Sequence, residues 1–229
     1  MSDTDKDVPE LEFSDKYTEE HAREYYHKHN KTGNLWRRLS NWREIVIARK
    51  ALKIAGNPTT LLDLPSGTGR FWEMLAENKD RKLFAADYNP SMYTVGMEER
   101  PKEITSRFET FQASAFDIPK PDNFVECIFC MRLLHHIGEH ADRMKMFREF
   151  HRVTSDTVLV SLWVDGNVKA KKRLAKEEKR DKKKYQNRFV QPRERVEAEM
   201  REAGFDIVDH VDFLKHYAMW RIYILRKKK

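Results

Sequence analysis

The sequence predicts an α/β fold in which helices flank a mostly parallel sheet that ends in an antiparallel hairpin. Strand-like and helix-like stretches alternate over residues 60–163, and this alternation is typical of parallel sheets. Two final strand-like runs, residues 205–214 and 217–225, predict the hairpin.

Length and composition indicate one domain. A chain of 229 residues, 40% hydrophobic and 35% charged, is long enough to bury a sizeable core. Its apolar runs are much shorter than the roughly 20 residues of a membrane-spanning helix. Residues 2–7 are polar and acidic, unlike a signal or transit peptide. We therefore expect a cytoplasmic protein.

A glycine turn at residues 63–70 follows the first predicted strand, 60–64, and precedes a predicted helix, 70–77. This order brings backbone N–H groups against a bound ligand. A dinucleotide fingerprint would need a third glycine where Trp72 stands, and a P-loop would need Gly-Lys-Ser/Thr. Asp87 follows the second predicted strand, and its carboxylate can accept both hydroxyl hydrogens of a ribose. The pattern predicts a nucleoside ligand bound without phosphate-binding groups.

The remaining elements continue this pattern. Further strands are predicted at residues 105–112, 124–131 and 157–163, and helices at 17–29, 35–55, 91–98, 141–153 and 192–203. Cys127 and Cys130 are the two cysteines of the chain and share one predicted strand. Because residues three apart on a strand point to opposite faces, we interpret them as buried structural cysteines and predict no metal site.

Four motifs carry a resemblance to a known family. Residues 63–70 (DLPSGTGR), 86–92 (ADYNPSM), 115–119 (AFDIP) and 133–137 (LLHHI) occur in this order. The series resembles that of class I S-adenosylmethionine-dependent methyltransferases, in the broad branch that includes the ubiquinone and menaquinone biosynthesis methyltransferases. Two residues depart from the family pattern: Pro65 replaces its first glycine, and Ser114 replaces an acid that often meets the adenine amino group.

The resemblance implies a Rossmann-like, seven-stranded methyltransferase sheet with S-adenosyl-L-methionine as cofactor. It divides the domain into an N-terminal arm with cofactor-covering helices (1–56), a cofactor-binding α/β core (57–166), a basic lid-like insertion (167–191), and a C-terminal helix and hairpin (192–229). The residues that it assigns to the cofactor are Asp63, Pro65, Ser66, Gly67, Gly69, Asp87, Tyr88, Ser114, Ala115, Phe116 and Met131. Phe116 either packs on the adenine or belongs to the core. Arg38 and Arg43 either bind the methionine carboxylate or are solvated arginines.

The chemistry implied is an in-line displacement, for which the protein chiefly aligns the reactants and excludes water. A weakly acidic acceptor also needs a general base, most often histidine. His135 and His136 follow the fourth predicted strand, at the sheet edge where α/β proteins bind ligands. Either one of them acts as this base or both brace the next helix. Tyr217 is a further catalytic candidate because the final hairpin borders the acceptor pocket in similar enzymes.

The net charge of +7 arises in one segment. Residues 169–188 contain eleven of the 44 basic residues and three of the 37 acidic ones. The segment is a solvated helix, a lid over an anionic acceptor, or a patch for anionic membrane lipids or RNA phosphates. We favour a lid, and a small-molecule, lipid-linked or glycan-type acceptor. The alternatives are an RNA or protein methyltransferase that grips its substrate through 169–188, and a binding module without activity.

Overall fold

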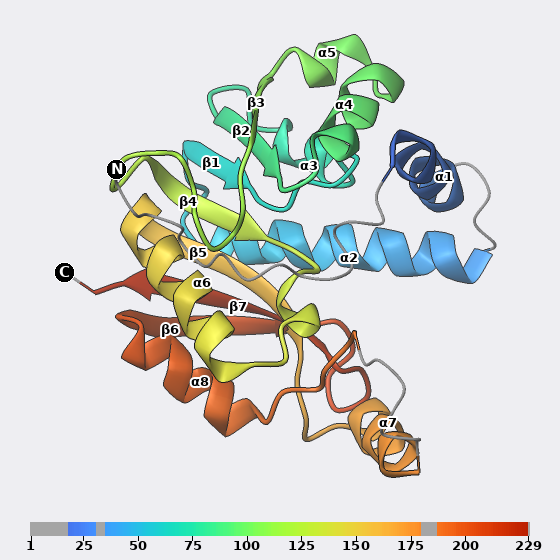
Figure 1. The fold of residues 1–229 in the computed structure, drawn as a ribbon, viewed down its shortest axis with the longest axis vertical. Coiled ribbons are helices and arrows are strands. Elements are labelled where there is room, and N and C mark those ends of the chain that lie inside the picture. The colour runs from blue at the N-terminus through green and yellow to red at the C-terminus, as the bar shows by residue number, and fades with distance from the viewer. Residues whose placement is uncertain (1–17, 31–34, 180–186, 229) are drawn as a thin grey trace, which may run out of the picture.

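A computed structural model describes residues 18–30, 35–179 and 187–228, which contain one seven-stranded sheet (Figure 1). The strands are β1 (Thr60–Asp63), β2 (Lys82–Asp87), β3 (Phe108–Gln112), β4 (Val125–Cys130), β5 (Thr154–Trp163), β6 (Phe205–Asp212) and β7 (Trp220–Lys227). Their order is β3-β2-β1-β4-β5-β7-β6. Strands β1 to β5 are parallel, and β7 is antiparallel to both β5 and β6. The predicted fold class and C-terminal hairpin are confirmed.

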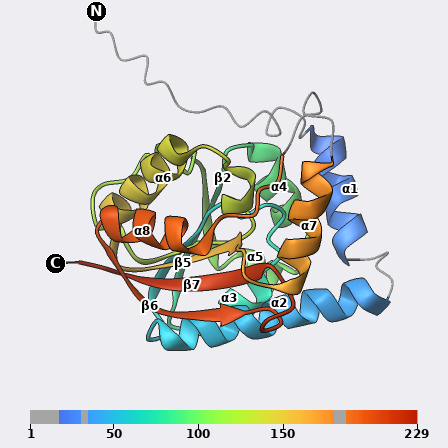
Figure 2. The same cartoon turned by 90° about the horizontal axis from the view of Figure 1, so that it is seen from below.

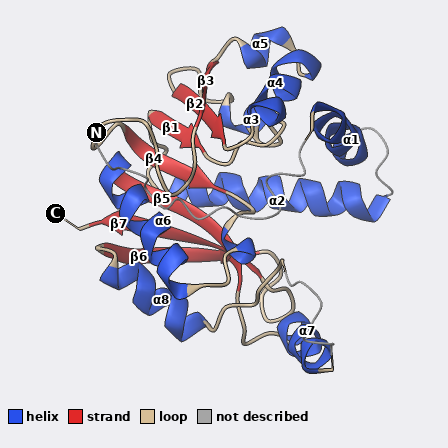
Figure 3. Cartoon of the chain, in the orientation of Figure 1, coloured by secondary structure: helices blue, strands red, loops and turns tan. Residues whose placement is uncertain are grey.

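Helices cover both faces of the sheet (Figure 3). The helices are α1 (Glu19–Asn30), α2 (Leu35–Ile54), α3 (Trp72–Leu75), α4 (Pro90–Glu99), α5 (Lys102–Thr105), η2 (Leu134–His136), α6 (His140–Val153), α7 (Val168–Glu178) and α8 (Arg193–Glu202). In Figure 2, α6 and α8 lie above the sheet and α2 lies below it. None of the described helices combines the length and apolarity needed to cross a bilayer.

Two buried clusters, one on each face of the sheet, form the core. Successive strand residues alternate between them: Leu61 packs with α2 and α3, whereas Leu62 packs with α6 and α8. The cysteines follow the same rule, because Cys127 lies in the α2 cluster and Cys130 in the α6 cluster. Both thiols are free, and burial raises the pKa of both, that of Cys127 to about 12. The prediction of buried cysteines on opposite faces is confirmed.

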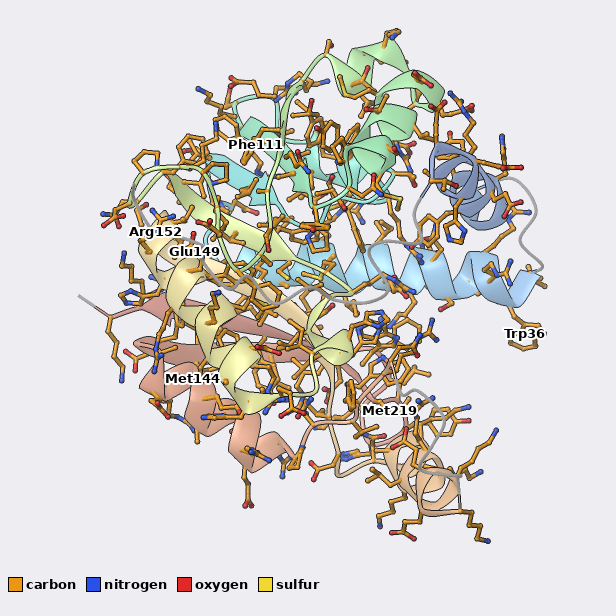
Figure 4. All side chains as sticks on the ribbon, viewed as in Figure 1. Trp36, Phe111, Met144, Glu149, Arg152 and Met219 are labelled. Carbon is orange, nitrogen blue, oxygen red and sulfur yellow. The ribbon has the colours of Figure 1, made fainter. Side chains whose placement is uncertain are left out.

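Helix α2 begins beyond the body of the domain. Trp36, in its first turn, is 78% exposed and points away from the sheet (Figure 4). Only the second half of α2 packs on the sheet, through Ile47, Ala48 and Leu52. Helix α1 instead packs on α4, where Tyr26 Oη donates to the Glu99 carbonyl at 3.0 Å.

Several predicted elements have other bounds in the structure, and two of these differences have a clear physical reason. The strand predicted from residue 105 begins at Phe108, because Pro101 starts the short helix α5 and its carbonyl accepts the N–H of Thr105 at 3.0 Å. The helix predicted over 70–77 shrinks to α3. Its first residues belong to the glycine turn, where Gly67 and Gly69 have φ of 54° and 71°.

A buried ion pair joins α6 to α8. The Arg143 guanidinium donates to both Glu199 oxygens, at 2.7 and 2.6 Å, and both side chains are nearly inaccessible to water. Burial alone would raise the pKa of Glu199, but hydrogen bonds from Arg143 and His140 lower it. A further hydrogen bond from Arg143 to the Gly138 carbonyl fixes the start of α6.

We expect Glu199→Ala to lower the free energy of unfolding by about 3–5 kcal/mol, because it leaves the Arg143 charge buried and unpaired. Urea denaturation followed by circular dichroism would measure this change.

A matched control lies on the same two helices. Arg148 and Glu202 form an exposed pair 3.7 Å apart, so Glu202→Ala should cost less than about 1 kcal/mol. Equal effects of the two substitutions would show that the buried pair does not join the helices.

Candidate active site

A cavity of about 260 Å3 opens at the carboxyl ends of β1, β2 and β4. This is close to the lower end of the range for small-molecule sites, about 300–1,000 Å3. Eleven residues predicted for the site line it: Pro65, Ser66, Gly67, Asp87, Tyr88, Ser114, Ala115, Phe116, Met131, His135 and His136. Five do not line it: Asp63, Gly69, Arg38, Arg43 and Tyr217.

The glycine turn forms the floor of the cavity. Gly69 faces away from the cavity and is needed for packing: a Cβ there would lie 2.4 Å from the Trp72 ring. That ring is fully buried and stacks on Phe108 with centroids 4.6 Å apart. Trp72, which occupies the position of the third glycine of a dinucleotide fingerprint, is therefore a core residue. Helix α3 is also too short to direct a dipole at a pyrophosphate.

Asp87 stands beside the turn at the end of β2. Its Oδ2 accepts the Gly67 N–H at 2.9 Å, and its Oδ1 accepts the Asn89 N–H at 3.1 Å. Burial raises the pKa of Asp87 to about 6, and the backbone N–H groups moderate this increase. The carboxylate is thus oriented by the backbone and ionised at neutral pH on the wall of the cavity.

Asp63 lies beneath the turn and is buried, with no hydrogen bond to either carboxylate oxygen. Desolvation raises the pKa of Asp63 well above its ordinary value, and the nearby Asp87 charge adds to this. The Trp72 indole N–H attracts the carboxylate and opposes the increase, although it is too poorly placed to form a hydrogen bond of normal geometry. Asp63 does not line the cavity, so it can influence a bound ligand only by positioning the glycine turn above it.

The loop after β3 forms a second wall. Ser114 Oγ accepts the Phe116 N–H at 3.2 Å, and Phe116 both lines the cavity and belongs to the buried core. Glu149 and Arg152 on α6 hold the end of this loop (Figure 4). Glu149 accepts the Ile118 N–H at 2.6 Å, and Arg152 donates to the Ile118 carbonyl at 2.9 Å. The wall is therefore anchored to a helix of the core.

The cations in the cavity differ from those predicted. Arg38 is exposed on α2, and Arg43 Nε donates to the Phe213 carbonyl at 2.8 Å, outside the cavity. Arg70 and Arg132 line the cavity instead.

Glu44 on α2 links these two arginines. Its carboxylate lies 3.0 Å from Arg70 Nη2 and 3.0 Å from Arg132 Nη1. Burial lowers the pKa of the Arg70 guanidinium, and Glu44 opposes the change. One acid thus holds two cations at the cavity.

The histidines lie at the β4 side of the cavity. His135 is 3% exposed, and its ring stacks on Trp163 with centroids 4.9 Å apart. His136 Nδ1 makes a short hydrogen bond to the Asn187 carbonyl. Tyr217 lies outside the cavity, where Lys169 is 5.3 Å above its ring.

The end of the basic segment contributes to the cavity. Residues 187–191 are joined to the core by hydrogen bonds from Phe189 N to the His135 carbonyl, at 2.7 Å, and from Gln191 N to the Trp163 carbonyl, at 2.8 Å. Asn187 and Arg188 consequently line the cavity. The predicted lid, 167–191, lies partly outside the described residues, at 180–186.

Sequence analysis did not single out Tyr25, Arg70 and Arg132 in the cavity, or Glu44 beside it. Arg188 belongs to the predicted lid, but its position in the cavity was not predicted. Arg70 could have been found from the sequence, because it directly follows the last glycine of the turn. Glu44 and Tyr25 could not have been, because their positions depend on how α1 and α2 pack against the sheet.

Sequence comparisons find similarity to methyltransferases over the middle of the chain. Residues 61–157 match the family model of a methyltransferase domain. The ubiquinone/menaquinone biosynthesis C-methyltransferase UbiE of Pectobacterium carotovorum subsp. carotovorum (strain PC1) is 36% identical over 98 residues, 41% of this chain and 37% of that protein. UbiE of Francisella tularensis subsp. novicida (strain U112) is 34% identical over 92 residues, 38% of this chain and 35% of that protein. The matched region is little more than a third of the length of these curated relatives.

Solved structures share the fold over most of the chain. Magnesium protoporphyrin IX methyltransferase from Synechocystis PCC 6803, with bound SAH, has a TM-score of 0.71 and 11% identity over 90% of this chain and 93% of that chain. A SAM-dependent methyltransferase from Aquifex aeolicus has a TM-score of 0.61 and 18% identity over 92% of this chain and 98% of that chain. Residues 61–157 thus resemble a methyltransferase domain and part of UbiE in sequence, and most of the chain shares the fold of these methyltransferase structures, in agreement with the predicted resemblance.

Proposed function

We propose that this protein is an S-adenosylmethionine-dependent methyltransferase that transfers a methyl group to a small-molecule acceptor, free or lipid-linked. The observation that carries the proposal is the Asp87 carboxylate, held by backbone N–H groups on the wall of the cavity beside the glycine turn. A carboxylate placed there suits a ribose diol and repels a phosphate.

The cavity residues fit the cofactor from end to end. Asp87 would accept the ribose hydroxyls, and the loop of Ser114 and Phe116 would border the adenine. At the other end, Arg70 would bind the methionine carboxylate in place of the predicted Arg38 and Arg43. A planar guanidinium is suited to a carboxylate because it can donate two parallel hydrogen bonds.

The cofactor supplies an activated methyl carbon on a sulfonium. This chain fixes its two ends, so the methyl group would face the β4 side of the cavity, next to His135 and His136. Burial lowers the pKa of both histidines, that of His136 to about 4. At neutral pH both rings are uncharged, and they would position the acceptor by hydrogen bonding while the cavity excludes water.

The first test concerns Asp87 and uses calorimetry with S-adenosylhomocysteine. Asp87→Ala should weaken binding at least tenfold, because hydrogen bonds to a charged group contribute about 1.5–3 kcal/mol each. The ribose hydroxyls would bind the ionised carboxylate, so binding must displace the proton that Asp87 holds below pH 6. Affinity should therefore fall as the pH is lowered through about 6 in the wild type, and stay level in the variant.

An unchanged dissociation constant in a folded Asp87→Ala protein would remove Asp87 from the site. Micromolar binding of NAD, with no heat from S-adenosylhomocysteine, would contradict the proposed function as a whole.

The second test concerns Arg70. Arg70→Gln should weaken binding of S-adenosylhomocysteine about tenfold or more, because the charge that pairs with its carboxylate is lost. Binding of 5′-methylthioadenosine should change little, because this nucleoside lacks the amino-acid part.

Arg43→Gln is the matched control, since Arg43 lies outside the cavity and should affect neither ligand. An equal loss for both ligands in Arg70→Gln would mean that Arg70 supports the turn and does not bind the carboxylate.

A further inference from the structure

The β4 side of the cavity is electropositive. Its lining includes Arg132 and Arg188, and Asp87 is the one carboxylate among the described lining residues. Asp87 is at the end of β2, and β1 lies between β2 and β4 in the sheet. An acceptor on the β4 side would therefore meet cations and no acid of the described cavity wall.

Two tryptophans hold these cations in place. The guanidinium carbon of Arg188 lies 5.9 Å from the Trp163 ring centroid, and that of Arg173 lies 5.0 Å from it. The guanidinium of Arg132 lies 5.4 Å from the Trp220 centroid. Cation–π contacts of this length are attractive and gain strength when water is excluded. These contacts place the arginines beside the rings of Trp163 and Trp220.

Two acids of the described residues lie beside these cations. Glu44 is shared between Arg70 and Arg132, and Glu177 pairs with Arg173 at 2.7 Å. A single carboxylate beside two guanidiniums leaves an excess of one positive charge. The cofactor carboxylate proposed to bind Arg70 would neutralise this excess, so an acceptor anion would meet the charge of Arg188 and that of the sulfonium.

His135 adds a polar atom without a partner. Its side chain is buried between Trp163 and Trp220, and its Nδ1 makes no hydrogen bond although the residue lines the cavity. A buried polar atom of this kind normally has a partner. Burial, then His136 and the three arginines, lower the pKa of His135. A histidine with a lowered pKa is a poor general base for a neutral hydroxyl or amine.

We propose that the methyl acceptor reaches the site as an oxyanion, a carboxylate or the anion of an acidic phenol, and is methylated on that oxygen while Arg188 and His135 hold it. The inference rests on the proposed function and specifies its substrate class. An acceptor that is already an oxyanion needs no general base in the site, because it has lost its proton before it binds.

The reaction balances without a base. The acceptor oxygen uses one lone pair to form the C–O bond, and the C–S bond breaks with its electrons on sulfur. The negative acceptor and the positive sulfonium become a neutral methyl ester or ether and a neutral thioether. Because opposite charges cancel, exclusion of water from the site favours the transfer.

The test uses protein saturated with S-adenosylhomocysteine and four probes: 1-naphthoate, 4-nitrophenolate, naphthalenemethanol and naphthalenemethylamine. Calorimetry should show that at least one of the two anions binds at least tenfold more tightly than the neutral alcohol and the amine. Arg188→Gln should remove this preference, and Arg188→Lys should restore part of it. Arg148→Gln is the control, because Arg148 is exposed on α6.

A second measurement identifies the oxyanion. With methyl-labelled S-adenosylmethionine, a methylated carboxylate releases labelled methanol in alkali, whereas a methylated phenol keeps its label. Label appearing in either product, and lost in Arg188→Gln, supports the inference.

Two outcomes would overturn the inference: no preference for anions across the four probes, or a preference that Arg188→Gln leaves intact. Both presuppose that S-adenosylhomocysteine binds. Failure of the protein to bind S-adenosylhomocysteine would instead contradict the proposed function, so the two failures are distinguishable.

Discussion

The hydrogen bond from the Gly67 N–H to the Asp87 carboxylate joins the ends of two neighbouring strands, β1 and β2. Together with the hydrogen bond from the Ser66 N–H to the Ala86 carbonyl, at 2.8 Å, it holds the glycine turn, which has positive φ at Gly67. Burial raises the pKa of this carboxylate, whereas the bond from Gly67 opposes the increase and so favours the ionised form, which can accept from hydroxyl donors. The loop of Ser114 and Phe116 also lines the cavity, so Asp87, the glycine turn and this loop together border the proposed nucleoside end.

The ion pairs of Glu44 with Arg70 and Arg132 shape the opposite end of the cavity. Glu44 comes from α2, Arg70 from the glycine turn and Arg132 from the end of β4, and their ion pairs join three segments distant in sequence. Arg132 has a φ of 67°, and its N–H donates to Ser161 Oγ on β5 at 2.8 Å. The cationic side of the cavity therefore depends on how α2 packs against the sheet, whereas the glycine turn and Asp87, on the proposed nucleoside side, directly follow two neighbouring strands.

This difference explains what the sequence could predict. The strands, the glycine turn and Asp87 follow from local patterns, because a buried strand and a tight turn are encoded by adjacent residues. The family resemblance points to Arg38 and Arg43, in the helical region before the sheet, but the direction of a helical side chain depends on how the helix packs. Arg43 points to the C-terminal hairpin, and Arg38 precedes the part of α2 that packs on the sheet. Glu44, the next residue after Arg43, is the one that reaches the cavity cations.

The most direct measurement of this account is a crystal structure of the protein with S-adenosylhomocysteine. The account predicts both ribose hydroxyls within about 3 Å of Asp87 Oδ1 or Oδ2, a hydrogen-bond distance, and the amino-acid carboxylate paired with Arg70. It also places the sulfur toward His135 and His136. A ligand whose ribose lies away from Asp87, or whose carboxylate lies at Arg188, would contradict the assignment of the two ends of the cavity.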